Sequence, residues 1–245
     1  GTAKVVVTGM GKYSNEVNAE ATFTVVPADA SKIKVTLGAD SCGTTHTYNG
    51  KSHEPAVTKA TLGQNANVTS QFDISYGTNI NAGKGTVILT PKKNNKNFTG
   101  TKTVEFDIEQ AVLTGTLTLY NDKNLVDNNN IFQYDGSAHT YAREVFTPSG
   151  SLANYVTEND YEIVYADNVY GKDWQGTQYG HVFVIGKGNF KGTLGKSQNN
   201  EFESDGTFIT ADGKKITSIA VSKLMIFNQA EIHKNNITVS NGTYY

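Results

Sequence analysis

Apolar and polar residues alternate along several short stretches of the chain. In residues 33–37, 72–76 and 104–108, every second residue is apolar. A period of two places alternate side chains on opposite faces of a strand, so these stretches predict half-buried β-strands. Such strands recur roughly every 8 to 12 residues with Gly and Asn between them, and no stretch has a helical period. The pattern predicts an all-β fold.

Asn-Gly and Asp-Gly pairs lie between the predicted strands, at 49–50, 135–136 and 212–213. Glycine adopts a positive φ without steric cost, and tight hairpin turns require that conformation. We therefore expect a hairpin turn at each of the three pairs.

Three short motifs occur twice in the same order, which reveals an internal repeat. The paired copies are YNGKSH at 48–53 with YDGSAH at 134–139, FDISY at 72–76 with YEIVY at 161–165, and KNFTG at 96–100 with GNFKG at 188–192. The spacing between copies grows along the chain, as expected for homologous modules with loop insertions.

The two ends carry partial copies of the same repeat. GTAKVVVTG at the start resembles the stretch that begins at Gly83, and ITVSNGTYY at the end resembles the run before Tyr48 and Tyr134. Either the protein continues beyond both ends or the modules are phased differently. The expected divisions are 1–28 as the back half of a repeat, 29–111 as a full repeat, 112–230 as a repeat with insertions, and 231–245 as the start of another.

Composition narrows the class of protein further. A hydrophobic content of 37% is low for one large core, so several small cores are expected. The net charge of -2 and the scattered basic residues provide no footprint for nucleic acid or an acidic membrane surface. The single cysteine, Cys42, excludes an internal disulfide, and no apolar run is long enough to insert into a membrane. The Thr- and Asn-rich, weakly charged composition is typical of bacterial surface proteins, so the expected location is extracellular, at the cell surface or secreted.

Taken together, the motifs resemble those of a known family. The Tyr-(Asn/Asp)-Gly-x-x-His start, the central Phe/Tyr-x-Ile-x-Tyr strand and the Asn-Phe hairpin resemble the "mostly bacterial Ig" repeats of large surface proteins. The second repeat departs from the first by having Tyr141 where Pro55 stands. The resemblance implies tandem immunoglobulin-like β-sandwich modules arranged end to end, within a stalk or adhesin region.

Histidines recur at one motif position, as His53 and His139. A histidine beside a turn that is repeated in each module is more often structural than catalytic. Ser52 has no acid placed to orient a triad, so no catalytic residue and no enzyme activity are assigned.

Two oxygen-rich runs are candidate metal sites. The first contains Asp122 and 127–130, and the second contains Asp160, Glu162 and Asp167. Neither has the ligand spacing of a calcium loop, and the sequence shows no Cys/His cluster for zinc. The prediction is no metal and no cofactor, with calcium as the alternative.

The second repeat contains a long segment rich in aromatic and polar residues. Aromatic rings that stack on a sugar, beside side chains that bond its hydroxyls, are typical of carbohydrate sites. The candidate ligand-binding residues are Tyr170, Asp173, Trp174, Gln175 and Tyr179. Alternatively, Trp174 folds back as part of its own core. A further insertion at 193–222 predicts an added hairpin around Asp212-Gly213.

These observations favour a structural function. The prediction is a stalk or adhesin region that spaces and presents a distal region, with adjacent repeats of the same chain or filament as its partners. One alternative is a module that binds a glycan or host surface protein through the aromatic segment. Another is an accessory domain of a secreted polysaccharide-degrading enzyme.

Overall fold

The structure, a computed structural model, is all-β with almost no helix. It describes residues 1–14, 19–41, 43–64, 66–121, 124–125, 131–169, 178–193 and 202–228. Two compact units are present. Unit 1 comprises Gly1–His46, Ser52–Ile80 and Lys84–Ile108, and unit 2 comprises Thr47–Lys51, Asn81–Gly83 and Glu109–Tyr245. Within the described ranges, no helix is long and apolar enough to cross a membrane.

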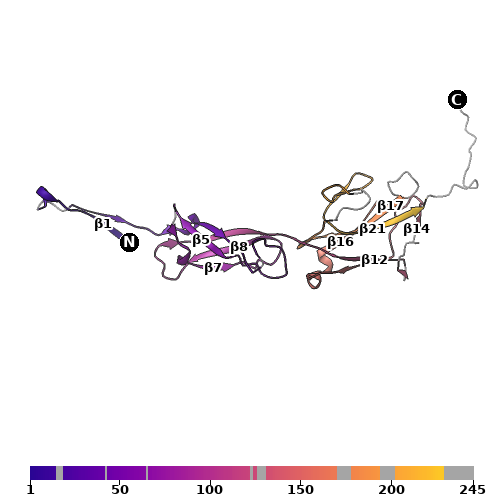
Figure 1. Cartoon of the computed structure of the whole chain (residues 1–245), viewed down its shortest axis with the longest axis horizontal. Coiled ribbons are helices and arrows are strands. Elements are labelled where there is room, and N and C mark those ends of the chain that lie inside the picture. Colours follow the sequence, from indigo (N-terminus) through magenta and orange to yellow (C-terminus); the bar gives the residue numbers. More distant parts are fainter. Residues whose placement is uncertain are drawn as a thin grey trace, which may run out of the picture. The chain divides into compact units, whose positions relative to one another are not determined.

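Short strands and single helical turns make up unit 1 (Figure 1). The strands are β1 (Thr2–Val7), β2 (Ala19–Thr24), β3 (Ala28–Asp29), β4 (Lys34–Leu37), β5 (Val57–Leu62), β6 (Ala66–Asn67), β7 (Phe72–Tyr76), β8 (Gly83–Pro91), β9 (Phe98–Thr99) and β10 (Lys102–Ile108). The 3-10 helices are η1 (Gly11–Tyr13), η2 (Ala30–Lys32) and η3 (Thr69–Gln71). Two sheets, β4-β5-β6 and β10-β8-β7, are accompanied by the pairs β1-β2 and β3-β9.

The core of unit 1 takes alternate residues from both three-stranded sheets. Val87 and Leu89 of β8 are fully buried, and Phe106 and Ile108 of β10 lie in the same cluster. The alternate side chains of β10, those of Thr103, Glu105 and Asp107, are exposed, which confirms the predicted period of two in this strand. Ile74 of β7 is the exception, because its side chain is 38% exposed although the pattern places it on the apolar face.

Unit 2 has the same kind of construction with additional elements. Its strands are β11 (Ala111–Val112), β12 (Gly115–Asn121), β13 (Asn124–Leu125), β14 (Ile131–Gln133), β15 (Arg143–Pro148), β16 (Tyr161–Ala166), β17 (Gln178–Gly186), β18 (Phe190–Lys191), β19 (Phe208–Ile209), β20 (Lys215–Ile216) and β21 (Ile219–Asn228). Its 3-10 helices are η4 (Ala153–Tyr155) and η5 (Glu158–Asp160).

Two sheets of unit 2 face each other across its main core. Figure 1 shows β12 on one side of the unit and β16, β17 and β21 on the other, in the sheets β13-β12-β15 and β14-β21-β17-β16. Leu117 and Leu119 of β12 meet Val182 and Val184 of β17 in one buried cluster. Tyr48 belongs to this unit, and its ring packs 5.3 Å from the ring of Phe190.

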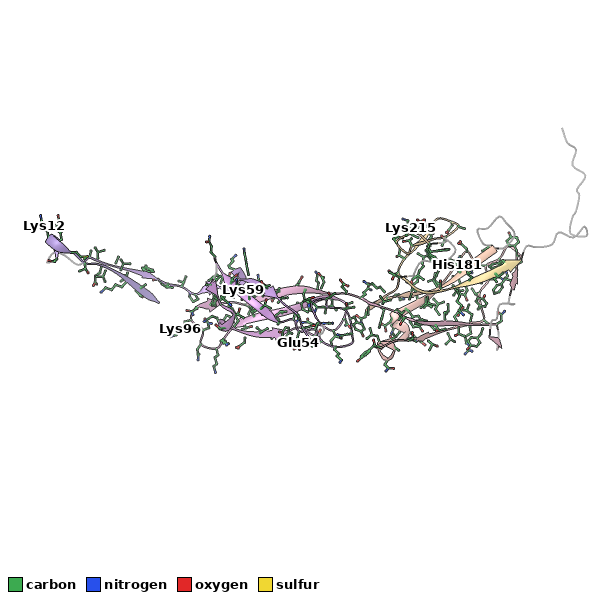
Figure 2. The ribbon with its side chains drawn as sticks, viewed as in Figure 1. Lys12, Glu54, Lys59, Lys96, His181 and Lys215 are labelled. Carbon is green, nitrogen blue, oxygen red and sulfur yellow. The ribbon has the colours of Figure 1, made fainter. Side chains whose placement is uncertain are left out.

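Within the four-stranded sheet of unit 2, the interior strand β17 is buried on both faces. Phe183 of β17 points away from the main core into a second cluster with Phe208 and Ile216 of the β19-β20 hairpin. His181 of β17 lies in this layer, with its ring 4.4 Å from that of Phe208, and Figure 2 labels it together with Lys215 of the hairpin. Burial on two faces explains why β17 is a continuous apolar run rather than an alternating one.

All three predicted glycines have a positive φ, namely 74° at Gly50, 81° at Gly136 and 85° at Gly213. Only Gly213 closes a tight hairpin, between β19 and β20, which confirms the hairpin predicted in the insertion. The hairpin prediction is wrong at the other two sites. Gly50 lies within the long connection from β4 to β5, and Gly136 lies between β14 and β15, which do not pair with each other.

The β1-β2 hairpin exposes side chains whose counterparts in the first full repeat are buried. Val7 is 61% exposed, whereas Leu89 at the matching position is 0% exposed. Phe23 is also exposed, whereas its counterpart Phe106 is buried. Figure 2 labels Lys12 at the turn end of this hairpin. The hairpin therefore has the sequence of a core-forming pair of strands, but within the described part of the chain no layer packs over it.

Matched truncations test this contrast. We expect Leu89→Ala to lower the free energy of unfolding of unit 1 by about 2–5 kcal/mol, because it leaves a cavity in a packed core. Val7→Ala should change it by less than about 0.5 kcal/mol, because the side chain is exposed. Urea unfolding followed by circular dichroism measures both. A large effect of Val7→Ala would show that the hairpin face is buried in solution.

Candidate functional site

The first repeated motif forms the same local turn in both of its copies, at 48–53 and at 134–139. The side-chain oxygen Oδ1 of Asn49 accepts a hydrogen bond from the backbone nitrogen of Lys51 at 2.8 Å. Asp135 accepts the equivalent bond from Ser137, also at 2.8 Å. This backbone hydrogen bond is the main reason that the pKa of Asp135 lies below its usual value. Both copies thus form an Asx-turn, which Asn and Asp side chains favour.

In each repeat, an asparagine forms two hydrogen bonds with the main chain of the motif histidine. In unit 1, the backbone nitrogen of His53 donates to the carbonyl of Asn79 at 2.9 Å, and Asn79 Nδ2 donates to the carbonyl of His53 at 3.0 Å. In unit 2, the corresponding distances between His139 and Asn168 are 2.8 and 2.7 Å. We call this two-bond arrangement the Asn–His clamp. It occurs at matching positions of both repeats.

The strand tyrosine of each repeat supports the same loop, with opposite hydrogen-bond roles. The Tyr76 hydroxyl donates to the carbonyl of Pro55 at 3.2 Å. The Tyr165 hydroxyl instead accepts from the backbone nitrogen of Tyr141 at 3.0 Å and donates to Glu144. Proline lacks the N–H that Tyr141 has, which explains the change of role. The departure at Tyr141 is therefore structural, and its buried ring lies in the main core of unit 2.

Around His53 the structure places a second histidine and a carboxylate. Nδ1 of His53 lies 2.7 Å from Oδ2 of Asp40, and Nδ1 of His46 lies 3.2 Å from the same oxygen. The side chains of Asp40, His46 and His53 are 2%, 9% and 0% exposed. These three residues, which we call the Asp–His–His cluster, offer ligand atoms that all lie within 4.8 Å of one another.

The environment of His139 is different although its motif position is the same. Its Nε2 lies 3.1 Å from Oδ1 of Asp135, and the two side chains are 21% and 55% exposed. Its ring packs against those of Phe132 and Phe227. His139 therefore belongs to a partly exposed pair rather than to a buried three-residue cluster.

Most of the predicted glycan-binding residues cannot be placed. Tyr170, Asp173, Trp174 and Gln175 lie outside the described residues, as do Asp122 and 127–130 of the oxygen-rich run. Tyr179 is in β17, where its backbone pairs with Ile226 of β21. The binding role of these residues stays a prediction.

Unit 2 has a pocket of about 410 Å³ beside Asn168 and Val169, where the predicted aromatic segment begins. The end of β16 and the β19-β20 hairpin line it, through residues that include Tyr165, Asp167, Asn168, Thr210, Asp212 and Lys214. The backbone nitrogen of Ala211 donates to Oδ1 of Asp167 at 2.7 Å, which ties the hairpin to the strand end. A hydrogen bond from the Thr210 hydroxyl lowers the pKa of Asp212, whose side chain lines the pocket.

Comparison of the chain with protein-family models, curated proteins and solved structures finds no match.

Sequence reasoning missed Asp40 and His46 as companions of His53. The three residues lie within a short stretch, but their spacing matches no common metal motif, and all three fall in the connection between β4 and β5, which has no regular strand structure. A search for any grouping of His and Asp within one long loop would have found them.

Titration of the Tyr165 phenol tests the hydrogen bonds that its hydroxyl forms with the loop of unit 2. Burial, followed by its bond to Glu144, raises the pKa of Tyr165 above its ordinary value. The unfolded chain then loses this proton at a lower pH than the folded chain. We therefore expect its contribution to stability to be complete below about pH 10 and to be lost as the pH rises further.

Ultraviolet titration of phenolate absorbance checks this expectation. Tyr165→Phe should remove one late-titrating phenol and reduce the loss of stability above about pH 10. Identical titration curves for the two proteins would contradict the assignment.

Proposed function

We propose that this chain belongs to the stalk or adhesin region of a bacterial cell-surface or secreted protein. In this proposal, immunoglobulin-like β-sandwich modules repeat end to end to space and present a distal region. The observation that carries it is the Asn–His clamp, which joins His53 to Asn79 and His139 to Asn168 with nearly the same distances. Motifs that repeat in sequence therefore also repeat in hydrogen bonding, as expected for homologous modules.

Two exposed surfaces support a tandem array. The apolar residues of the β1-β2 hairpin match positions that are buried in the first full repeat. Tyr134 is 37% exposed, whereas Tyr48, at the same motif position, is buried in the core of unit 2. In a tandem array, the first strands of another repeat would pack over the apolar side chains of this hairpin. A further repeat would bury the Tyr134 ring in its core, as unit 2 buries Tyr48. Adjacent repeats are thus the proposed partners.

The proposed role is mechanical, and we assign no reaction to the chain. Each unit has its own buried cluster, so a module can form its core largely from its own residues. The cysteine-poor, weakly charged composition supports an extracellular location of the bacterial type.

Small-angle X-ray scattering tests the arrangement end to end. A compact globule of this length would have a radius of gyration of about 18 Å. An extended array should give a clearly larger value and a distance distribution with a long tail. A radius near the compact value at several protein concentrations would contradict the proposal.

A second candidate function is glycan binding by unit 2. The pocket beside Asp167 and Asn168 favours it, since this pocket adjoins the start of the segment in which the aromatic site is predicted. Polar side chains within a concave site can bond sugar hydroxyls.

An oligosaccharide panel screened by glycan array and calorimetry tests this second function. Trp174→Ala should weaken binding at least tenfold through loss of stacking, about 1.4 kcal/mol or more. Tyr13→Ala is the matched control, because it removes an exposed aromatic ring from unit 1. No binding by the unaltered chain, or equal loss in both variants, would exclude the idea.

A further inference from the structure

We propose that the Asp–His–His cluster of unit 1 is a binding site for a divalent transition-metal ion of the Zn²⁺ class. Asp40 Oδ2 and one ring nitrogen each of His46 and His53 would be its ligands. The inference is independent of the proposed stalk function, because it concerns the internal chemistry of one module.

The three donors are held by the main chain and by packing before any ion binds. The Asn–His clamp fixes the backbone of His53 on both sides of its peptide group. The ring of His46 packs edge-on at 4.9 Å from Phe106 of the core. Asp40 forms backbone hydrogen bonds with Gly43 in both directions, at 2.9 and 3.2 Å. Such preorganisation lowers the entropic cost of assembling a site.

The distances suit a small ion with little rearrangement. Ligands bonded to a tetrahedral ion at about 2.0–2.1 Å lie roughly 3.3 Å apart. His46 Nδ1 and Asp40 Oδ2 are already 3.2 Å apart. His53 Nδ1 is nearer to this oxygen, at 2.7 Å, and would have to withdraw by roughly 0.6 Å. Without an ion, the same contacts serve as hydrogen bonds.

The chemistry of the donor set selects the class of ion. Two imidazole nitrogens are borderline ligands, and together with one carboxylate oxygen they suit Zn²⁺ and similar first-row ions. Calcium and magnesium prefer sites made almost wholly of oxygen ligands. A buried carboxylate also loses its hydration, and a divalent cation compensates for that loss strongly.

Burial indicates that the ion would be structural rather than catalytic. None of the three side chains is more than 9% exposed, so a substrate has little access to the ion. The ion would join the residues after β4 to the residues before β5. It would thereby stabilise unit 1 according to its affinity and its free concentration.

The second repeat supplies a matched control within the same chain. His139 occupies the motif position of His53, has the same main-chain clamp, and pairs with the more exposed Asp135. A substitution of His139 removes an imidazole from the same motif position without touching the cluster.

Titration of the chelator-treated, metal-free chain with Zn²⁺, by competition with a chromophoric chelator, tests the site. We expect one ion per chain, and at least about tenfold weaker binding for Asp40→Asn, His46→Gln and His53→Gln. His139→Gln should bind like the unaltered chain. Binding of no ion, or equal weakening by His139→Gln, would overturn the proposal.

Two further measurements keep the test decisive if a variant fails to fold or if the Cys42 thiol binds the ion. Co²⁺ added to the unaltered chain should give the visible absorption of a four- or five-coordinate nitrogen- and oxygen-ligated ion, and a spectrum of free hydrated Co²⁺ would overturn the site. Cys42→Ser should keep the one-to-one stoichiometry. Loss of binding in Cys42→Ser alone, with the three cluster variants unaffected, would assign the ion to the thiol and overturn the proposal.

Discussion

The long connections that precede β5 and β15 contain the motif histidines, whose backbone groups bond an asparagine outside the neighbouring strands. A buried peptide group without a partner is costly, so the fold must supply one. In each repeat a single asparagine does this, using its own main-chain carbonyl and its side-chain amide to bond both sides of the motif histidine. Asn79 also bonds Thr86 of β8 in both directions, which ties the connection to the central strand of its sheet.

The clamp sets the position of the histidine backbone, but the surroundings decide what the ring does. In unit 1 the ring of His53 is buried beside Asp40 and His46. In unit 2 the ring of His139 lies beside a solvent-exposed carboxylate and two phenylalanines. One repeated motif thus produces two different chemical environments, because the residues that face it come from segments outside the motif.

The insertion in the second repeat changes the packing of the whole sheet. The β19-β20 hairpin covers the face of β17 that would otherwise be exposed to water, and Phe183 anchors the added layer. The same hairpin lines the pocket at the end of β16. The first full repeat has no counterpart of this hairpin in its sequence.

The sequence by itself determined the all-β class, the strands with a period of two and the positive φ of Gly50, Gly136 and Gly213, because these features depend on residues that are close together in the chain. It also determined the internal repeat, because the repeated motifs occur in the same order. Periodicity reveals that one face of a strand is buried, but not what buries it. Only the tertiary structure decided that Tyr48 packs in unit 2, that β17 is covered on both faces, and that Asp40 and His46 meet His53. Each of these depends on contacts between segments whose approach is set by the packing of several strands, and no local pattern encodes that approach.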